Sequence, residues 1–187
     1  MAQTYEEMDA IALLKADHRK VEDIFAQFEK ATSTSKKQSL ALQACLELKV
    51  HTALEEEIFY PACRAAGVEE DLMDESYVEH DSAKLLINEI EAASAEDDFY
   101  DAKVKVLSEA IEHHVEEEEK RAEGMFAQAR AAGLDMDRLA DDMRARKMTA
   151  MEEFQAGKPA EPRTLQGGDE ESAMSEEPLA PEANPAA

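Results

Sequence analysis

The sequence predicts an all-α protein: an up-down-up-down four-helix bundle with an extra C-terminal helix and a disordered acidic tail. Three observations lead to this fold class. Apolar residues recur at steps of three and four along four long segments, as on one face of a helix. Glycine and proline number only six each among 187 residues, which suits long helices with few turns. The connections between the segments are short, which makes neighbouring helices antiparallel.

The first two helices are expected from residue 6 to about 31 and from about 36 to 65. His18 occupies a position where the apolar repeat of the first helix calls for a hydrophobic residue. Residues 32–35, Thr-Ser-Thr-Ser, prefer caps and turns and should separate the two helices. Pro61 lies near the end of the second helix, where we expect it to kink or tighten the last turns.

The third helix is expected at about 70–94, and the fourth should begin near Asp97 or Asp98, which are good N-terminal caps. The last 31 residues hold five of the six prolines and seven acids, and such a segment cannot bury enough apolar surface to order itself. The predicted organisation is a four-helix bundle over 1–133, a C-terminal helix over 134–156 and a disordered acidic tail over 157–187.

The charge and the cysteines bear on partners and location. The formal net charge is −24, which repels phosphate backbones and anionic membranes, so we expect no nucleic-acid and no membrane partner. No apolar run approaches the roughly 20 residues of a membrane-spanning helix, and residues 1–15 carry acids where a signal peptide carries bases. Cys45 and Cys63 are 18 positions apart on one predicted helix, about 27 Å, so they cannot pair within the chain. A cytoplasmic protein in a reducing compartment is expected.

Four of the five histidines lie on helix faces that should be apolar. Counted from the nearest predicted turn, each lies about 10 to 16 residues along its helix, so the four imidazoles should reach one level of the bundle. Two glutamates, each four residues after a histidine, share a helix face with it. Uncompensated buried carboxylates cost several kcal/mol each, and metal ions would supply the compensation. The predicted ligands are His18, His51, Glu55, His80, His114 and Glu118.

A repeat within the chain indicates a paired metal site. The lone histidine and the following His-x-x-x-Glu pair are 33 residues apart in the first half and 34 in the second. The core should therefore have an approximate two-fold axis, which suits two adjacent ions. Four further residues stay open as members of the site. Glu22 and Glu56 could each add a carboxylate, Tyr77 could pack or hydrogen-bond a metal-bound species, and His113 is expected at the surface or in a supporting role.

Imidazole and carboxylate ligands together suit iron, manganese or zinc. Zinc prefers closed tetrahedral sites or a single catalytic ion, whereas six ligands for two ions leave room for bridging oxygen. Iron is therefore favoured over manganese and zinc. The ferritin-like di-iron class requires a glutamate three residues before a histidine. Those positions hold Lys15, Leu48, Tyr77 and Ile111, which excludes that class.

Two motifs, His51-Thr-Ala-Leu-Glu55 and His114-Val-Glu-Glu-Glu118, each follow a lone histidine. Together with the runs 55–61 and 113–119, this order resembles the haemerythrin-like HHE cation-binding domain family over about residues 9–130. The resemblance implies a four-helix bundle holding two non-haem iron ions joined by an oxo or hydroxo bridge. The six predicted ligands would hold that centre.

The resemblance also shows two departures from the oxygen-carrying haemerythrins. Those proteins have a second histidine four residues after the third-helix histidine, where this chain has Lys84. They have an aspartate five residues after the fourth-helix histidine, where this chain has Glu119. One imidazole fewer leaves a coordination position for water, Tyr77 or an extra carboxylate.

Three functions are consistent with such a centre. The first is a protein that binds dioxygen or nitric oxide for sensing, storage or scavenging, because an open iron position in an apolar bundle favours binding over turnover. The second is a peroxidase- or catalase-like enzyme for stress protection, with His113, Tyr77 or Glu22 as candidate acid–base groups. The third is iron handling. The sequence indicates no particular protein partner.

Overall fold

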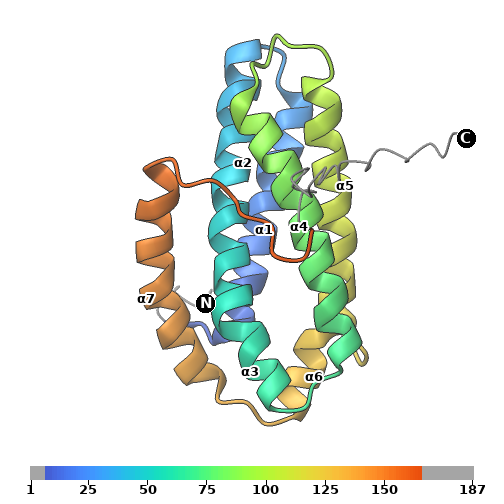
Figure 1. Cartoon of the computed structure of the whole chain (residues 1–187), viewed down its shortest axis with the longest axis vertical. Helices are drawn as coiled ribbons and strands as arrows, with labels where there is room; N and C mark the ends of the chain where they lie inside the picture. Colours follow the sequence, from blue (N-terminus) through green and yellow to red (C-terminus); the bar gives the residue numbers. More distant parts are fainter. Residues whose placement is uncertain (1–6, 166–187) are drawn as a thin grey trace, which may run out of the picture.

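The computed structural model describes residues 7–165, and its long helices form the predicted antiparallel bundle (Figure 1). No residue in this range lies in a β-strand. The elements are α1 (Ala10–Lys30), α2 (Thr34–Leu54), the π-helical turn η2 (Glu55–Phe59), α3 (Tyr60–Ala65), α4 (Glu70–Ala92), α5 (Tyr100–Glu119), α6 (Met125–Ala131) and α7 (Met136–Gln155).

Side-chain caps set the ends of several helices. Asp9 begins α1 by accepting the backbone N–H of Ala12 at 2.9 Å, and Ser33 begins α2 in the predicted turn. The fourth helix was expected to begin near Asp97 or Asp98 with one of them as its cap; it begins two residues after Asp98, at Tyr100, and the capping role is wrong. The Asp97 carboxylate accepts the N–H of Ser94 at 2.8 Å within the loop, and α5 begins later, after Phe99 in the left-handed region (φ 68°).

The second long helix widens where the sequence suggested a kink or a tightened turn. Pro61 has no N–H and its ring clashes with a carbonyl four residues earlier in an α-helix. The turn before it is a π-helix, in which the Tyr60 N–H bonds the Glu55 carbonyl. In an unbroken α-helix, residues five apart point about 140° away from each other. The widened turn reduces that angle and brings Tyr60 toward the face that carries Glu55.

Two apolar clusters fill the bundle and leave a polar level between them. The cluster around Phe28 includes Val21, and the cluster around Phe59 includes Leu14, so on α1 the histidine at position 18 lies between the two. The same order holds around His51 on α2 and His80 on α4. Cys45 lies in the first cluster and Cys63 in the second, and both thiols are free. The ligand level is therefore enclosed by apolar side chains above and below.

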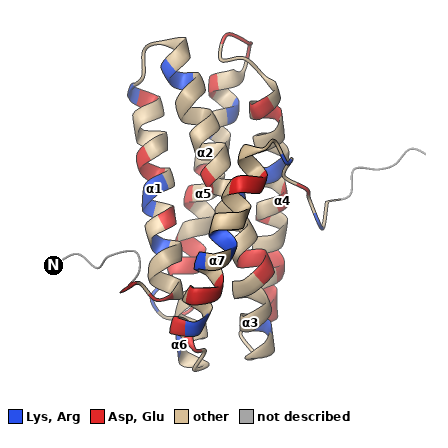
Figure 2. Ribbon diagram, turned by 90° about the vertical axis from the view of Figure 1, so that its left-hand side faces the viewer, with Lys and Arg blue, Asp and Glu red and all other residues tan. Residues whose placement is uncertain are grey.

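The C-terminal part lies against the outside of the bundle. The predicted C-terminal helix is α7, which packs on α1 and α2 (Figures 1 and 2). Residues 157–165, which the sequence assigns to the tail, instead continue as an extended segment that crosses α2 and reaches α4 (Figure 1). We call this segment the strap. The Asp81 carboxylate fixes its end by accepting the backbone N–H groups of Arg163, Thr164 and Leu165. The remainder of the expected tail, 166–187, lies outside the described residues.

Acidic and basic residues are interspersed over the outer helix faces, including α7 (Figure 2). None of the helices in the described range is long and apolar enough to cross a membrane.

Candidate metal centre

The structure brings all six predicted ligand residues together at mid-height in the bundle. Each of the four long helical segments contributes at least one of them, and every side chain is at most 5% exposed. Two groups of ligand atoms could each surround an ion, with Glu55 common to both. The first position is formed by His18, His51, Glu55 and Glu118, and the second by Glu55, His80 and His114.

The Nε2 atoms of the histidines face each other in two pairs. His18 Nε2 and His51 Nε2 are 3.1 Å apart, and His80 Nε2 and His114 Nε2 are 3.2 Å apart. Glu55 Oε2 lies 3.1 Å from His51 Nε2 and 3.3 Å from the His80 nitrogen, so this carboxylate spans both pairs.

Behind each imidazole lies a carboxylate that faces its Nδ1 atom. Three distances are those of hydrogen bonds, between 2.8 and 3.1 Å, and the fourth, from Asp17 to His51, is 3.9 Å. We call these four acids the outer carboxylates. The pairs are Glu119 with His18, Asp17 with His51, Glu56 with His80 and Glu79 with His114.

The outer carboxylates follow the repeat of the sequence. Asp17 and Glu79 each precede a lone histidine, yet each faces the other histidine of its pair. Glu56 and Glu119 each follow a ligand glutamate, and each faces the lone histidine of the opposite half. The two-fold relation of the ligands therefore extends to the groups that orient them. Metal-bound histidines commonly donate their second ring N–H to a carboxylate in this way.

The hydrogen bonding within the site calls for a cation. An ionised carboxylate only accepts, so in the neutral imidazoles of His80 and His114 the Nδ1 atom carries the proton and the Nε2 atom presents a lone pair. Two lone pairs 3.2 Å apart repel unless a positive centre lies against both. Glu55 Oε1 and Glu118 Oε2 are also buried and accept no hydrogen bond. These orphaned atoms are the donor types that bind iron, manganese or zinc, so the residues fit a pair of metal ions.

Among the protein groups alone, protons offset part of this buried charge. Burial lowers the pKa of His51, but the carboxylates of Glu55 and Asp17 outweigh it and raise this pKa to about 10. Burial and the charge of Glu55 raise the pKa of Glu118 to about 8. Burial lowers the pKa of His18 to about 4. Cations must therefore displace protons to bind at the first position.

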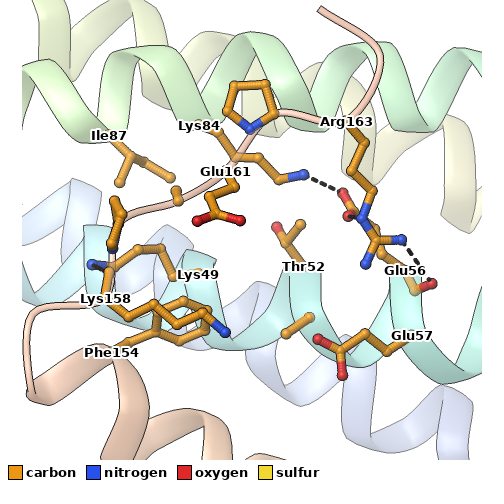
Figure 3. Close-up of a pocket in the computed structure, with 14 residues that line it drawn as sticks. Lys49, Thr52, Glu56, Glu57, Lys84, Ile87, Phe154, Lys158, Glu161 and Arg163 are labelled. Atoms are coloured by element: carbon orange, nitrogen blue, oxygen red, sulfur yellow. Dashed lines mark hydrogen bonds and ion pairs between the residues drawn. The ribbon is translucent and has the colours of Figure 1, made fainter. Parts of the chain in front are cut away.

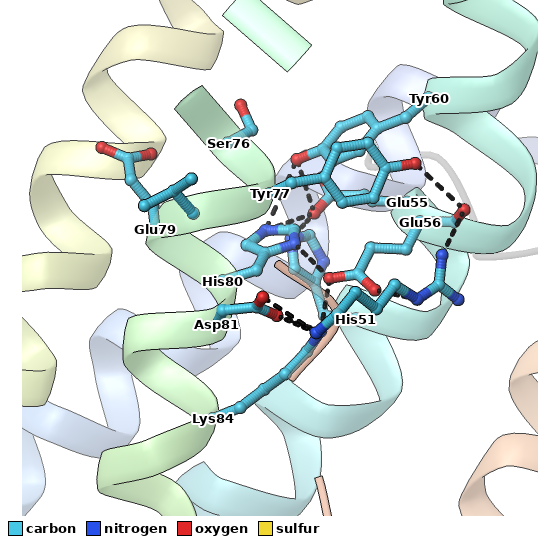
Figure 4. A network of polar contacts seen from close by, with 12 residues as sticks. His51, Glu55, Glu56, Tyr60, Ser76, Tyr77, Glu79, His80, Asp81 and Lys84 are labelled. Carbon is cyan, nitrogen blue, oxygen red and sulfur yellow. Dashed lines mark hydrogen bonds and ion pairs between the residues drawn. The ribbon is translucent and has the colours of Figure 1, made fainter. Parts of the chain in front are cut away.

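Tyr60 is a site residue that the sequence reasoning missed. Its hydroxyl donates to Glu118 Oε1 at 3.0 Å, and lies 3.4 Å from both Glu55 Oε2 and His80 Nε2 (Figure 4). The side chain is fully buried. Tyr60 belongs to the run 55–61, which is part of the family resemblance, but in a regular α-helix its side chain would point away from the ligands. Only the π-helical turn before Pro61 could have revealed it.

The sequence left open whether four further residues belong to the metal site, and the structure puts them in different surroundings. Glu22 is exposed and pairs with Arg19, away from the ligands. His113 is exposed, as expected. Tyr77 packs edge-on against the Tyr60 ring, with centroids 5.4 Å apart, and its hydroxyl bonds a backbone carbonyl (Figure 4). Glu56 is an outer carboxylate.

Lys84 stands where the oxygen-carrying haemerythrins have a further histidine. Its ammonium lies 2.7 Å from Glu56 and 3.0 Å from Asp81 (Figure 4). The residue therefore supports an outer carboxylate and leaves the second position with three of the predicted ligands, next to Tyr60. Phe126 of α6 stacks on the His18 ring with centroids 5.8 Å apart and covers the first position.

The fold and this donor set define a helical-bundle, cation-binding protein. The family model for the hemerythrin HHE cation binding domain matches residues 9–126, more than half of the chain. The chain belongs to this family.

Two individual proteins show similarity. The crystal structure of a hemerythrin HHE cation binding domain-containing protein from Mycobacterium kansasii has the same fold, with a TM-score of 0.68 and 19% identity over 80% of this chain and 91% of that one. A DNA nickase from Nostoc sp. is 29% identical over 114 residues, which is 61% of this chain and 32% of that protein. The chain thus spans about a third of the length of that relative.

Proposed function

We propose that this protein binds two non-haem iron ions and that the centre binds dioxygen or another small diatomic or peroxide ligand. The opposed Nε2 pairs carry the proposal, because each pair has its Nδ1 sides turned to carboxylates and its Nε2 atoms turned inward toward each other. The ligands would be His18, His51, Glu55, His80, His114 and Glu118.

The spacing of the Nε2 atoms suits two nitrogens bound to one ion. Two nitrogens bound at right angles to one ion, each at about 2.1 Å, lie about 3.0 Å apart, and at the tetrahedral angle about 3.4 Å apart. The observed separations of 3.1 and 3.2 Å lie between these two values. Imidazole and carboxylate donors suit iron, manganese or zinc, and six ligands for two ions leave room for bridging oxygen, which favours iron.

The second position is the one that would accept an external ligand. It has three protein ligands against four at the first. The Tyr60 hydroxyl lies beside it, 3.4 Å from His80 Nε2. Its one proton points to Glu118 Oε1 and would turn from that oxygen to donate to a bound small molecule. Bound iron would supply the electrons and the Lewis acidity, whereas the protein supplies orientation, an apolar enclosure and this donor.

Metal analysis together with optical spectroscopy tests the proposal. We expect the wild type and His113→Ala, whose imidazole is exposed, to hold iron in a ratio of two per chain. We expect His114→Ala to lose the second ion. Mixing the reduced wild type with dioxygen in a stopped-flow instrument should produce a charge-transfer band. A chain without stoichiometric transition metal, or a loaded chain with no oxygen-dependent band, would contradict the respective part of the proposal.

Turnover of hydrogen peroxide is a second candidate, and Tyr60 favours it. A peroxidase- or catalase-like reaction needs a proton donor near the open position, and Tyr60 has the buried hydroxyl closest to His80. If peroxide is turned over, Tyr60→Phe should reduce the steady-state rate about 100-fold. Tyr77→Phe, which removes the neighbouring hydroxyl, should leave the rate near that of the wild type. Equal rates in both variants would dismiss a proton-donor role.

The relative from Nostoc is named a DNA nickase, which suggests DNA as a substrate to consider. We propose no DNA-directed activity for this chain, because its net charge of −24 opposes binding to a phosphate backbone. A shift assay with duplex DNA at low salt should show no complex.

A further inference from the structure

The C-terminal extension places basic side chains beside two of the outer carboxylates of the metal centre. The family model ends at residue 126, and the chain continues through α7 and the strap along the outside of the bundle (Figure 1). Two of the outer carboxylates receive their basic partner from this extension. Lys147 of α7 pairs with Asp17, and Arg163 of the strap pairs with Glu56.

The contact of Arg163 is the more direct of the two. Its Nε atom lies 3.0 Å from Glu56 Oε2 (Figure 3), and the other oxygen of that carboxylate lies 3.1 Å from His80 Nδ1 (Figure 4). Glu56 is only 4% exposed, so its two oxygens are committed to defined partners. The Arg163 guanidinium thus holds one oxygen of Glu56, and the His80 imidazole and the Lys84 ammonium share the other, 3.1 and 2.7 Å away. The carboxylate in turn fixes the plane of the ring.

The backbone of the strap is held firmly enough to place Arg163. Asp81 accepts three successive backbone N–H groups at the end of the strap, and the Thr164 hydroxyl at 2.7 Å. Nearer α7, Asn88 exchanges two hydrogen bonds with the backbone of Ala160, at 2.7 and 3.1 Å. Lys49 also donates to the carbonyl of Lys158. These contacts anchor the strap to α2 and α4 independently of the Arg163 side chain.

Lys147 has the corresponding place behind the first position. The Asp17 oxygen that does not contact Lys147 faces His51 Nδ1 at 3.9 Å, and neither of these two atoms has a hydrogen-bond partner. The pair needs less than 1 Å of closure to become a hydrogen bond. Lys147 therefore holds Asp17 in the direction of the ring it would orient.

We infer that the extension formed by α7 and the strap is a positioning element for the metal centre, in which Arg163 acts through Glu56 on His80 and Lys147 acts through Asp17 on His51. One histidine of each metal position is thus oriented from outside the four-helix bundle. The inference rests on the proposed function, since its consequence is the affinity of each position for iron.

The experiment measures iron affinity at both positions by competition with chelators, in the full-length protein. Arg163→Met should weaken the second position by about 10–100-fold, and Lys147→Met the first, as expected for loss of an outer partner of a metal-bound histidine. Arg163→Lys should recover part of the loss. Lys158→Met is the matched control, because Lys158 lies on the same strap and its ammonium pairs with the exposed Glu153.

A second readout separates positioning from stability. Arg163→Met should change the ¹⁵N signal of His80 Nδ1 in the metal-free chain, whereas Lys158→Met should not. Two results would overturn the inference. One is that the iron affinities of Arg163→Met equal those of Lys158→Met, and the other is that Arg163→Met loses affinity equally at both metal positions. Failure of the wild type to take up iron would overturn the proposed function as well, so the two failures are distinguishable.

Discussion

The two halves of the metal centre have equivalent ligands but unequal surroundings. Each half supplies a lone histidine, a His-x-x-x-Glu pair and two outer carboxylates in matching places. At the first metal position, Glu119, which faces His18, is held by Lys15 and Arg19 at the rim of the bundle. At the second, Glu56, which faces His80, is buried and is held by Lys84 and by the strap. The repeat therefore fixes the ligands, and the residues around them differentiate the two positions.

The halves also differ in what covers them. Phe126 lies flat on the first position, against His18. The hydroxyl of Tyr60 lies against the second, next to His80. An apolar ring offers nothing to an external ligand, whereas a hydroxyl can donate a hydrogen bond. On the proposed function, this difference suits the first position to a structural role and the second to reaction with an external ligand, and three predictions test this division.

Loss of the shared carboxylate should have the largest effect. Because Glu55 belongs to both groups of ligands, Glu55→Ala should remove both irons, whereas His18→Ala should remove only the one at the first position. Metal content per chain, measured after desalting, distinguishes these outcomes. Glu22→Ala is the control, since that exposed carboxylate lies away from the ligands. Retention of one ion by Glu55→Ala would show that the two positions do not share this bridge.

The pH dependence of iron binding should separate the two positions. At pH 6 to 7 the free chain keeps a proton on His51, with a pKa of about 10, and on Glu118, with a pKa of about 8. Iron must displace both, so affinity at the first position should rise with pH, by about 100-fold per unit below pH 8.

At the second position, the neighbouring Glu55 and Glu56 outweigh burial and raise the pKa of His80. Iron must displace the proton that this raised pKa favours, so affinity at the second position should also rise with pH, but less steeply than at the first position, where two protons are displaced. Chelator competition at pH 6 and 7 measures both slopes. Equal slopes at the two positions would remove this distinction.

The smallest expected effect concerns the cover of the first position. A Cβ at Gly124 would lie 2.5 Å from the backbone carbonyl oxygen of Glu118, where α6 turns back onto α5. Gly124→Ala should therefore displace α6 and lower the free energy of unfolding by about 1–3 kcal/mol. Thermal or urea unfolding measures the loss. Iron release from the first position should accelerate more than from the second, and Gly133→Ala, at an open turn with positive φ, controls for a general loss of stability.

Much of the bundle and the convergence of the ligand residues could be predicted from periodicity. Helical spacing fixes which residues share a face, and short connections fix the level at which faces meet. These two rules place His18, His51, His80 and His114 together without any knowledge of side-chain contacts. The same rules correctly put His113 at the surface.

The residues that periodicity could not find depend on departures from regular structure or on long-range contacts. Tyr60 reaches the ligands through a π-helical turn, which shifts the register within one element. Residues 157–165 look like tail by composition, but their order comes from backbone donors that converge on Asp81. No local pattern signals such a contact across more than 80 residues. The start of α5 also depended on a loop hydrogen bond of Asp97 rather than on its capping preference.

The single π-helical turn shifts the register of its helix. His51 and Glu55, which lie before or at its start, point toward the ligand level. Tyr60, which follows it, points toward the same level only because the turn accommodates one extra residue. If these residues formed a regular α-helix with no change in their number, every ligand residue would be kept, yet the phenol of Tyr60 would point about 140° away from Glu55. Related chains with a regular α-helical turn and the same number of residues here could therefore hold the same metals and perform different chemistry.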